Sequence, residues 1–165
     1  MILILILVLL DVFIKGFVYF KFLDVDIKFL NGWIGFAPMI NRKQASIFNL
    51  GLNMGIGTLA LIFVNMAFLI GLGFIYHRLL KLGILNAHIK VFISLFISGS
   101  ICSIIDKLVL GGSLDYILIK KFVCDLKDIY LFMALIYLIT YILKTGSLTK
   151  TNDIQLIKKI LGINK

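Results

Sequence analysis

Long apolar runs constrain the fold of this chain more than any other feature of its sequence. Residues 50–76 and residues 91–105 contain no charged side chain. Across the whole protein 61% of residues are hydrophobic and only 15% are charged, whereas a soluble domain is typically about 45–50% apolar and about 25% charged. A soluble domain of 165 residues cannot bury runs of this length, so the sequence predicts an integral membrane protein.

The apolar runs are hydrophobic on all sides, which predicts helices, because transmembrane strands would alternate apolar and polar residues. One span needs roughly 20 residues, so the chain has room for four spans and their loops. The N-terminal run has no positively charged residues ahead of it, and we expect a retained helix rather than a signal peptide. We predict an all-α integral membrane protein, a single membrane domain (residues 1–165) built as a four-transmembrane-helix bundle, with helices at about residues 1–23, 50–76, 89–108 and 128–143.

The segments between and after the helices differ in composition from the spans. Residues 24–47 are polar and aromatic and contain Trp33, Gly35 and Pro38. Tryptophan is enriched at membrane–water interfaces, so we expect a small extracytoplasmic loop with a β-like platform after the first helix. Residues 144–165 form the predicted cytoplasmic tail, whose pattern fits either an amphipathic helix on the inner leaflet or a disordered end.

Positive charge predicts the orientation in the membrane. The net charge is +9, and +7 of it comes from two segments: residues 77–90, with three basic residues and no acid, and the tail, with five lysines and Asp153. The positive-inside rule places both segments, and therefore both termini, in the cytoplasm. The basic charge is explained by topology and anionic lipids, and no aromatic and basic stripe indicates binding to nucleic acid.

Two carboxylates stand out beside the apolar runs. Asp106 ends the third predicted helix and Asp128 begins the fourth, so both lie at the same membrane face, joined by only about twenty residues. Two nearby carboxyl groups at a low-dielectric boundary do not both ionise easily, which leaves one carboxylate and one carboxylic acid at neutral pH. Such a pair can activate a water molecule and protonate a leaving amine. The alternative is that both residues simply flank their helices at the water boundary.

Three further polar residues have more than one interpretation. Asp11 and Lys15 are four residues apart, which fits either an ion pair within the helix or a polar strut that supports the carboxylate site. Asn53 is either a boundary residue or a hydrogen-bond donor to a substrate backbone. The two cysteines lack C-x-x-C spacing, and no H-E-x-x-H or phosphate-binding glycine loop is present, so we expect no metal and no cofactor.

The order and spacing of these residues resemble the lipoprotein signal peptidase (signal peptidase II) family, four-helix membrane aspartic proteases of bacteria. The D-x-x-x-K block of that family matches Asp11 and Lys15, and its N-x-G block matches Asn53-Met54-Gly55. Its G-N-x-x-D-R block aligns with Asp106 and Lys107, with Asp115 in register downstream. Its F-N-x-A-D block aligns with Asp128.

The chain departs from the family pattern at several positions, among them Cys124 in place of the phenylalanine of the last block and Gly57-Thr58 after the N-x-G block. Ser103 and Asp125 each replace an asparagine, and Lys127 replaces a small alanine. A lysine beside Asp128 is expected to favour its ionised form, and the extra carboxylate of Asp125 is expected to oppose that effect. These departures leave open a catalytically inactive homologue that binds lipidated precursors. A second alternative is a small membrane transporter, in which Asp11, Lys15 and the carboxylate pair would form an aspartate relay.

The resemblance implies an aspartic endopeptidase that removes the signal peptide from diacylglyceryl-modified prolipoproteins in the bacterial cytoplasmic (inner) membrane. It implies that Asp106 and Asp128 are catalytic and face the extracytoplasmic side, without metal or cofactor. The implied partners are the prolipoprotein and membrane lipids, with the protein acting as a monomer. The implied substrate-binding and supporting residues are Asn53, Gly55, Ser103, Lys107, Asp115, Asp125, Asp11 and Lys15.

Overall fold

Four helices and one small sheet make up the part of the chain that the structure describes. The structure, a computed structural model, describes residues 2–42, 57–83, 85 and 87–145. Its helices are α1 (Ile2–Lys21), α2 (Thr58–Lys81), α3 (Ala87–Leu110) and α4 (Leu126–Thr145). Its strands are β1 (Ile27–Phe29), β2 (Ile34–Asn41), β3 (Ser113–Ile119) and β4 (Phe122–Cys124), with a 3-10 turn, Leu30–Gly32, between β1 and β2.

The helices have the length and the apolar surface of membrane spans. Within the described ranges, α1, α2 and α3 are long and apolar enough to cross a bilayer. Large apolar side chains point outward, including Phe13 and Phe63, which are 75% and 69% exposed. In a lipid bilayer this outer surface contacts acyl chains and is not a defect. The protein is therefore a multi-pass membrane protein; a fourth span at α4, which also packs on α3, stays a prediction.

The predicted helix positions agree with the structure, with small shifts at the ends. α1 and α4 begin and end within two residues of the predicted bounds, and α3 is longer by two residues at each end. α2 continues five residues past the predicted end at residue 76. The predicted beginning of that helix at residues 50–56 and most of the tail, residues 146–165, lie outside the described residues.

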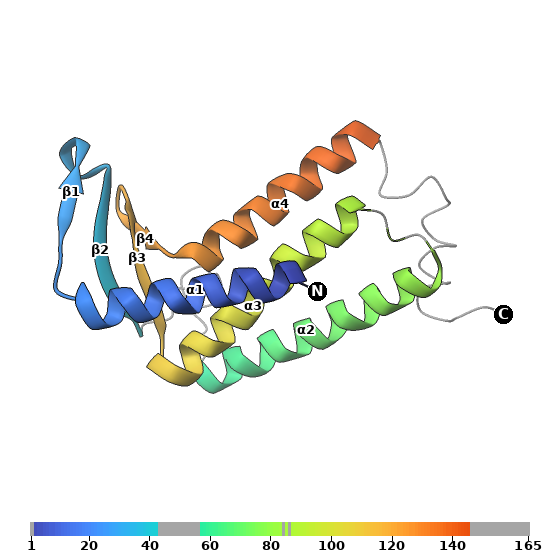
Figure 1. Cartoon of the computed structure of the whole chain (residues 1–165), viewed down its shortest axis with the longest axis horizontal. Coiled ribbons are helices and arrows are strands. Elements are labelled where there is room, and N and C mark those ends of the chain that lie inside the picture. Colours follow the sequence, from blue (N-terminus) through green and yellow to red (C-terminus); the bar gives the residue numbers. More distant parts are fainter. Residues whose placement is uncertain (1, 43–56, 84, 86, 146–165) are drawn as a thin grey trace.

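A four-stranded antiparallel sheet lies at one end of the helices (Figure 1). Its order is β1-β2-β3-β4, so the predicted platform after the first helix is completed by two strands from the α3–α4 connection. The β2–β3 register shifts between Phe36 and Met39, and this irregularity contains Pro38. Proline has no backbone N–H to donate to a ladder, which explains why it occupies a bulge in a central strand. The strands in residues 113–124 were not predicted.

Close packing of α3 and α4 brings the beginning of α4 next to the end of α3. Gly99 of α3 faces Leu131 of α4, and a Cβ atom at position 99 would lie 2.8 Å from the Leu131 Cγ atom. Small residues allow such close helix contacts in membranes. On the other side, Val18 of α1 packs with Leu114 and Tyr116 of β3. The sheet and the helix ends are thereby fixed together.

Candidate active site

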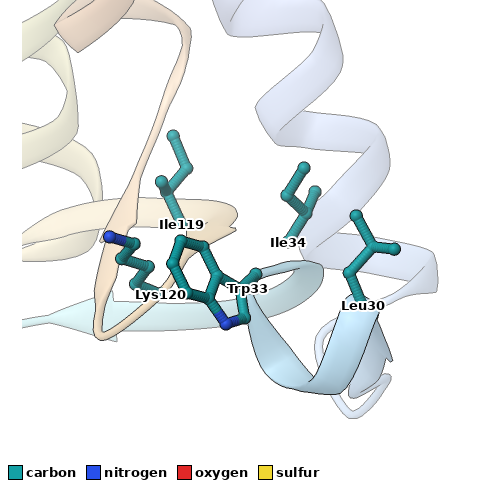
Figure 2. Close-up of a pocket in the computed structure, with 5 residues that line it drawn as sticks. All are labelled: Leu30, Trp33, Ile34, Ile119 and Lys120. Carbon is teal, nitrogen blue, oxygen red and sulfur yellow. The ribbon is translucent and has the colours of Figure 1, made fainter.

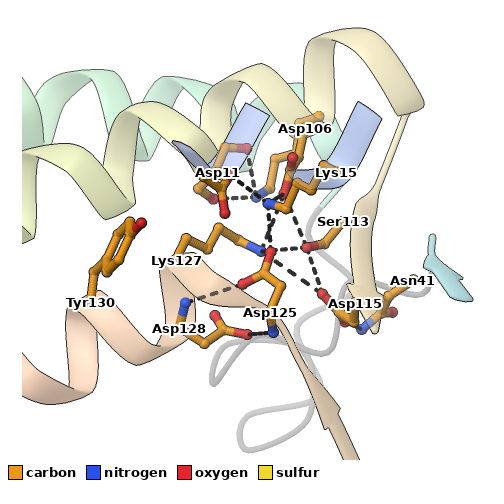
Figure 3. Close-up of polar contacts among 12 residues, drawn as sticks. Asp11, Lys15, Asn41, Asp106, Ser113, Asp115, Asp125, Lys127, Asp128 and Tyr130 are labelled. Carbon is orange, nitrogen blue, oxygen red and sulfur yellow. Dashed lines mark hydrogen bonds and ion pairs between the residues drawn. The ribbon is translucent and has the colours of Figure 1, made fainter. Parts of the chain in front are cut away.

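Six charged side chains are buried where the sheet joins the helices, and we call them the charged network (Figure 3). Each is at most 5% exposed, although charged groups are rarely buried unless they are paired. They come from α1, from α3, from β3, and from the residue before α4 and its first turn. The members of the charged network are Asp11, Lys15, Asp106, Asp115, Asp125 and Lys127.

Lys15 joins three carboxylates from three parts of the chain. Its Nζ atom lies 2.9 Å from an oxygen of Asp11, 2.7 Å from Asp106 and 2.6 Å from Asp125. The ion pair within α1 that the D-x-x-x-K pattern suggested is present, and its lysine also reaches across to α3 and to the beginning of α4. Lys15 fixes the relative positions of these elements.

Lys127 is the second cation of the network. Its ammonium group pairs with Asp125, contacts the Ser113 hydroxyl, and lies 3.2 Å from Asp106 Oδ2 and 3.8 Å from Asp115 Oδ1. Two lysines thus bind Asp106 and Asp125 from both sides. Several carboxyl groups this close together are also typical of a metal site. Here the ammonium group of Lys127 supplies positive charge to Asp115 and Asp125.

Asp115 is held by two residues that the sequence did not indicate. Asn41 Nδ2 donates to Asp115 Oδ2 (3.2 Å), and the Ser113 hydroxyl lies 2.8 Å from Asp115 Oδ1 and 3.2 Å from Asp106 Oδ2. Burial raises the pKa of Asp115, and Lys127, Ser113 and Asn41 partly offset that rise. Asn41 and Ser113 are paired across β2 and β3, so only the strand register brings them to the site.

Asp125 and Asp128 form a reciprocal cap at the beginning of α4. The Asp128 backbone N–H donates to Asp125 Oδ1 (3.1 Å), and the Asp125 N–H donates to Asp128 Oδ2 (3.2 Å). This is the capping-box arrangement, which satisfies two backbone donors at a helix N-terminus. Burial opposes ionisation of Asp125, but Lys127 and Lys15 outweigh it and hold the pKa of Asp125 below its usual value.

Asp106 and Asp128 lie at the same site but do not bond to each other directly. Within the residues that the structure describes, no hydrogen bond joins them, and the connection runs from Asp106 through Lys127 and Asp125 to Asp128 (Figure 3). Asp128 is half-buried, and one of its oxygens lies within 4.8 Å of oxygens of Asp115 and Asp125. The predicted carboxylates therefore belong to one cluster, and Lys127 lies within that cluster.

The remaining predicted residues lie apart from this network or outside the described ranges. Lys107 donates to the Ser103 hydroxyl (2.6 Å) and to the Ser103 carbonyl (3.3 Å) one turn earlier in α3. Asn65 of α2 also donates to the Ser103 hydroxyl (3.1 Å), so this group ties α2 to α3. Asn53 and Gly55 lie outside the described residues.

The far edge of the sheet carries an exposed amphipathic group, the Trp33 tip (Figure 2). The Lys120 ammonium lies 4.0 Å from the centre of the Trp33 ring, and the Lys120 N–H donates to the Trp33 carbonyl (2.7 Å). An open pocket of about 460 Å³ lies beside them. The residues that line it, and that define the Trp33 tip, are Leu30, Trp33, Ile34, Ile119 and Lys120.

Comparisons with known proteins agree on the family and the fold. A protein-family model described as signal peptidase (SPase) II matches residues 3–144. Two solved structures, each described as a bacterial membrane enzyme determined by the in meso method, at 2.3 and 1.9 Å resolution, superpose with TM-scores of 0.67 and 0.64. They share 17% sequence identity with this chain and cover 92% and 91% of it, with 92% of each solved chain covered. At that identity they show the fold alone. No curated protein sequence matches the chain.

Proposed function

The chain belongs to the signal peptidase II family, aspartic peptidases that cleave lipoprotein signal peptides, and on this premise we propose that Asp106 and Asp128 are its two catalytic aspartates. The family inferred from the motif order is thereby confirmed, as is the mostly helical membrane fold. The observation that carries the residue assignment is the convergence of both carboxyl groups on one buried, charged site at the junction of α3, α4 and the sheet.

The chemistry needs one carboxylate and one carboxylic acid. The carboxylate takes a proton from a water molecule while the water oxygen attacks the carbonyl carbon of the scissile peptide bond. The carboxylic acid then donates its proton to the leaving nitrogen, which departs as the amine of the mature lipoprotein. The crowding of carboxyl groups around Asp128, with oxygens of three of them within 4.8 Å of one another, favours this division of protonation states.

The other polar residues have supporting roles in this proposal. Lys15 and Asp11 fix the site to α1, and Asp115 and Asp125 fix it to the sheet and to the beginning of α4. Ser103 and Lys107 supply donors for carbonyl groups of the extended substrate. Asn53 and Gly55 take substrate-binding roles on the basis of the family pattern alone.

The proposed substrate is a diacylglyceryl-modified prolipoprotein that approaches from the bilayer. The Trp33 tip, with exposed apolar side chains beside Lys120, suits the membrane–water interface and contacts lipid head groups. The clustering of basic residues at residues 77–90 and in the tail supports cytoplasmic termini and an extracytoplasmic site in the bacterial cytoplasmic membrane.

The test is cleavage of a diacylglyceryl-modified prolipoprotein by the purified protein in detergent or lipid. Asp106→Asn and Asp128→Asn each abolish release of the signal peptide, because each removes one of the two proton-transfer groups. Asp26→Asn, in an exposed ion pair with Lys28 just before β1 (the Asp26 side chain is 57% exposed), is the matched control and keeps full activity. A folded parent that binds the precursor without cleaving it would instead indicate an inactive homologue.

A further inference from the structure

The two proposed catalytic aspartates differ in their ion pairs with the lysines of the site. Asp106 Oδ2 lies 2.7 Å from the Lys15 ammonium and 3.2 Å from the Lys127 ammonium. Asp128 forms no ion pair within 4.0 Å in the part of the chain that the structure describes. The ion pairs of Lys127 are with Asp106, Asp115 and Asp125, and its charge acts on Asp128, as sequence adjacency suggested, only from beyond ion-pair distance.

The balance of charge requires a proton somewhere in this cluster. Among the residues that the structure describes, five carboxyl groups meet here and two ammonium groups are in ion-pair contact with them: Lys15, with Asp11, Asp106 and Asp125, and Lys127, with Asp106, Asp115 and Asp125. Carboxyl groups that crowd together in a low-dielectric site do not all ionise, and a nearby cation keeps its partner charged. The proton therefore belongs on the carboxyl group that has no cation in contact.

We propose that Lys127 is a positioning residue that keeps Asp106 ionised and leaves the proton of the catalytic pair on Asp128. Asp106 is then the base that activates water, and Asp128 is the acid that protonates the leaving amine. This assignment rests on the proposed function. It concerns a position at which this chain departs from the small residue of the family pattern.

The atoms of the two carboxyl groups fit these roles. All contacts of Asp106 in the described residues fall on Oδ2, which leaves Oδ1 to accept a proton from water. Asp128 Oδ2 accepts the Asp125 N–H, so the proton of Asp128 resides on Oδ1. Lys127 can hold this arrangement because it is buried and bound at its ammonium end by Ser113 as well as by the carboxylates.

Every element around the pair contributes groups that titrate, and the assignment takes them into account. α1 supplies one cation and one carboxyl group, α3 a lysine that bonds to Ser103, β3 a carboxyl group, and the end of β4 a thiol. The residue before α4 supplies one more carboxyl group, and the first turn of α4 supplies one more ammonium group. These residues are Asp11, Lys15, Lys107, Asp115, Cys124, Asp125 and Lys127.

The first experiment locates the proton without using activity. Protein labelled with carbon-13 at the aspartate side-chain carboxyl is purified in detergent at neutral pH, and the infrared C=O stretch of protonated carboxyl groups is recorded. We expect Asp128→Asn to lose part of this band and Asp106→Asn to retain it in full. Loss of the band in Asp106→Asn with retention in Asp128→Asn would overturn the proposal. If the parent fails to cleave, the proposed function fails, and this measurement still decides where the proton resides.

The second experiment tests Lys127 through the pH–rate profile of prolipoprotein cleavage. Lys127→Met removes the cation, and we expect the acid limb of the profile to move up by about one pH unit or more, because Asp106 Oδ2 loses the ammonium group that lies 3.2 Å away. Lys127→Arg keeps the charge and leaves the acid limb in place. Identical acid limbs in Met, Arg and parent proteins would refute a role for Lys127. Thermal unfolding of each variant establishes that it is folded, and if Lys127→Met is not, the infrared measurement decides.

Discussion

The charged network and the Trp33 tip both include residues of the same small sheet, but their lysines make opposite kinds of contact. In the network, Lys15 and Lys127 are each 5% exposed and pair with several carboxylates from different elements. At the tip, Lys120 is exposed and lies over the ring of Trp33, which is itself 57% exposed. The first region fixes the positions of helices and strands, whereas the second presents a mixed apolar and basic surface to its surroundings.

The difference in burial decides how much each lysine contributes to stability. Removing one partner of a buried ion pair costs about 3–5 kcal/mol, because the other charge is left buried without compensation. An exposed cation–π contact contributes about 0.5–1 kcal/mol, and an exposed ion pair about 0–1 kcal/mol. The network should therefore determine whether the site forms, and the tip should affect only what the protein binds.

The largest effect is expected from Lys15→Met, which leaves Asp11, Asp106 and Asp125 short of one cation. We expect the free energy of unfolding to fall by about 3–5 kcal/mol and cleavage of the prolipoprotein to be lost. Thermal unfolding in detergent measures the first effect. Lys28→Met is the matched control, because Lys28 pairs with Asp26 on the surface with side chains that are 54% and 57% exposed. A loss below about 1 kcal/mol, as for an exposed pair, would remove the contrast between the two regions.

The second prediction concerns two of the departures from the family pattern in the last block, Asp125 and Lys127. Asp125→Asn retains the helix cap, because asparagine caps about as well as aspartate, but it removes the strongest partner of Lys127. We expect Asp125→Asn alone to lose more stability than the double variant Asp125→Asn/Lys127→Ala. The coupling free energy between the two positions should be about 0.5–3 kcal/mol, the range for residues in contact.

A double-mutant cycle from the unfolding of the parent, both single variants and the double variant gives this coupling free energy. The cycle of Asp26→Asn with Lys28→Ala is the exposed comparison, with an expected coupling of about 0.2–1 kcal/mol. Purely additive effects at positions 125 and 127 would mean that the two departures arose independently and do not compensate each other in charge.

The sequence predicted the helices and most of the charged residues because both depend on local patterns. Apolar runs of about twenty residues define spans regardless of tertiary contacts, and the spacing of Asp11 and Lys15 places them on one helix face. The order of motifs brought Asp106, Asp115, Asp125 and Asp128 into one hypothesis. These features could be predicted because each depends on residues that are close together in the sequence.

Strands β3 and β4 and the residues Asn41 and Ser113 were missed because they depend on pairing between distant segments. Asn41 is opposite Ser113 in the β2–β3 register, 72 positions further along the chain. Both reach Asp115 only because a bulge at Pro38 sets that register. The ion-pair partners of Lys127 could not be predicted from neighbouring residues either, because they come from α3, from β3 and from the cap of α4.

The smallest effect on stability is expected at the Trp33 tip, and it makes the comparison with the network sharpest. Trp33→Ala removes the ring under Lys120 and much of the exposed apolar surface beside the pocket, but it disturbs no buried charge. We expect the free energy of unfolding in detergent to change by no more than about 1 kcal/mol. In vesicles, cleavage of a diacylglyceryl-modified prolipoprotein should slow through a higher KM, because the tip no longer anchors the sheet at the interface. Lys120→Met, which keeps the indole and the stem of the lysine, should give a smaller increase. Two results would contradict this separation of roles: an unchanged KM in both variants, or a loss of kcat like that of Lys15→Met. Either would show that the Trp33 tip does not act in substrate binding while the charged network acts in positioning.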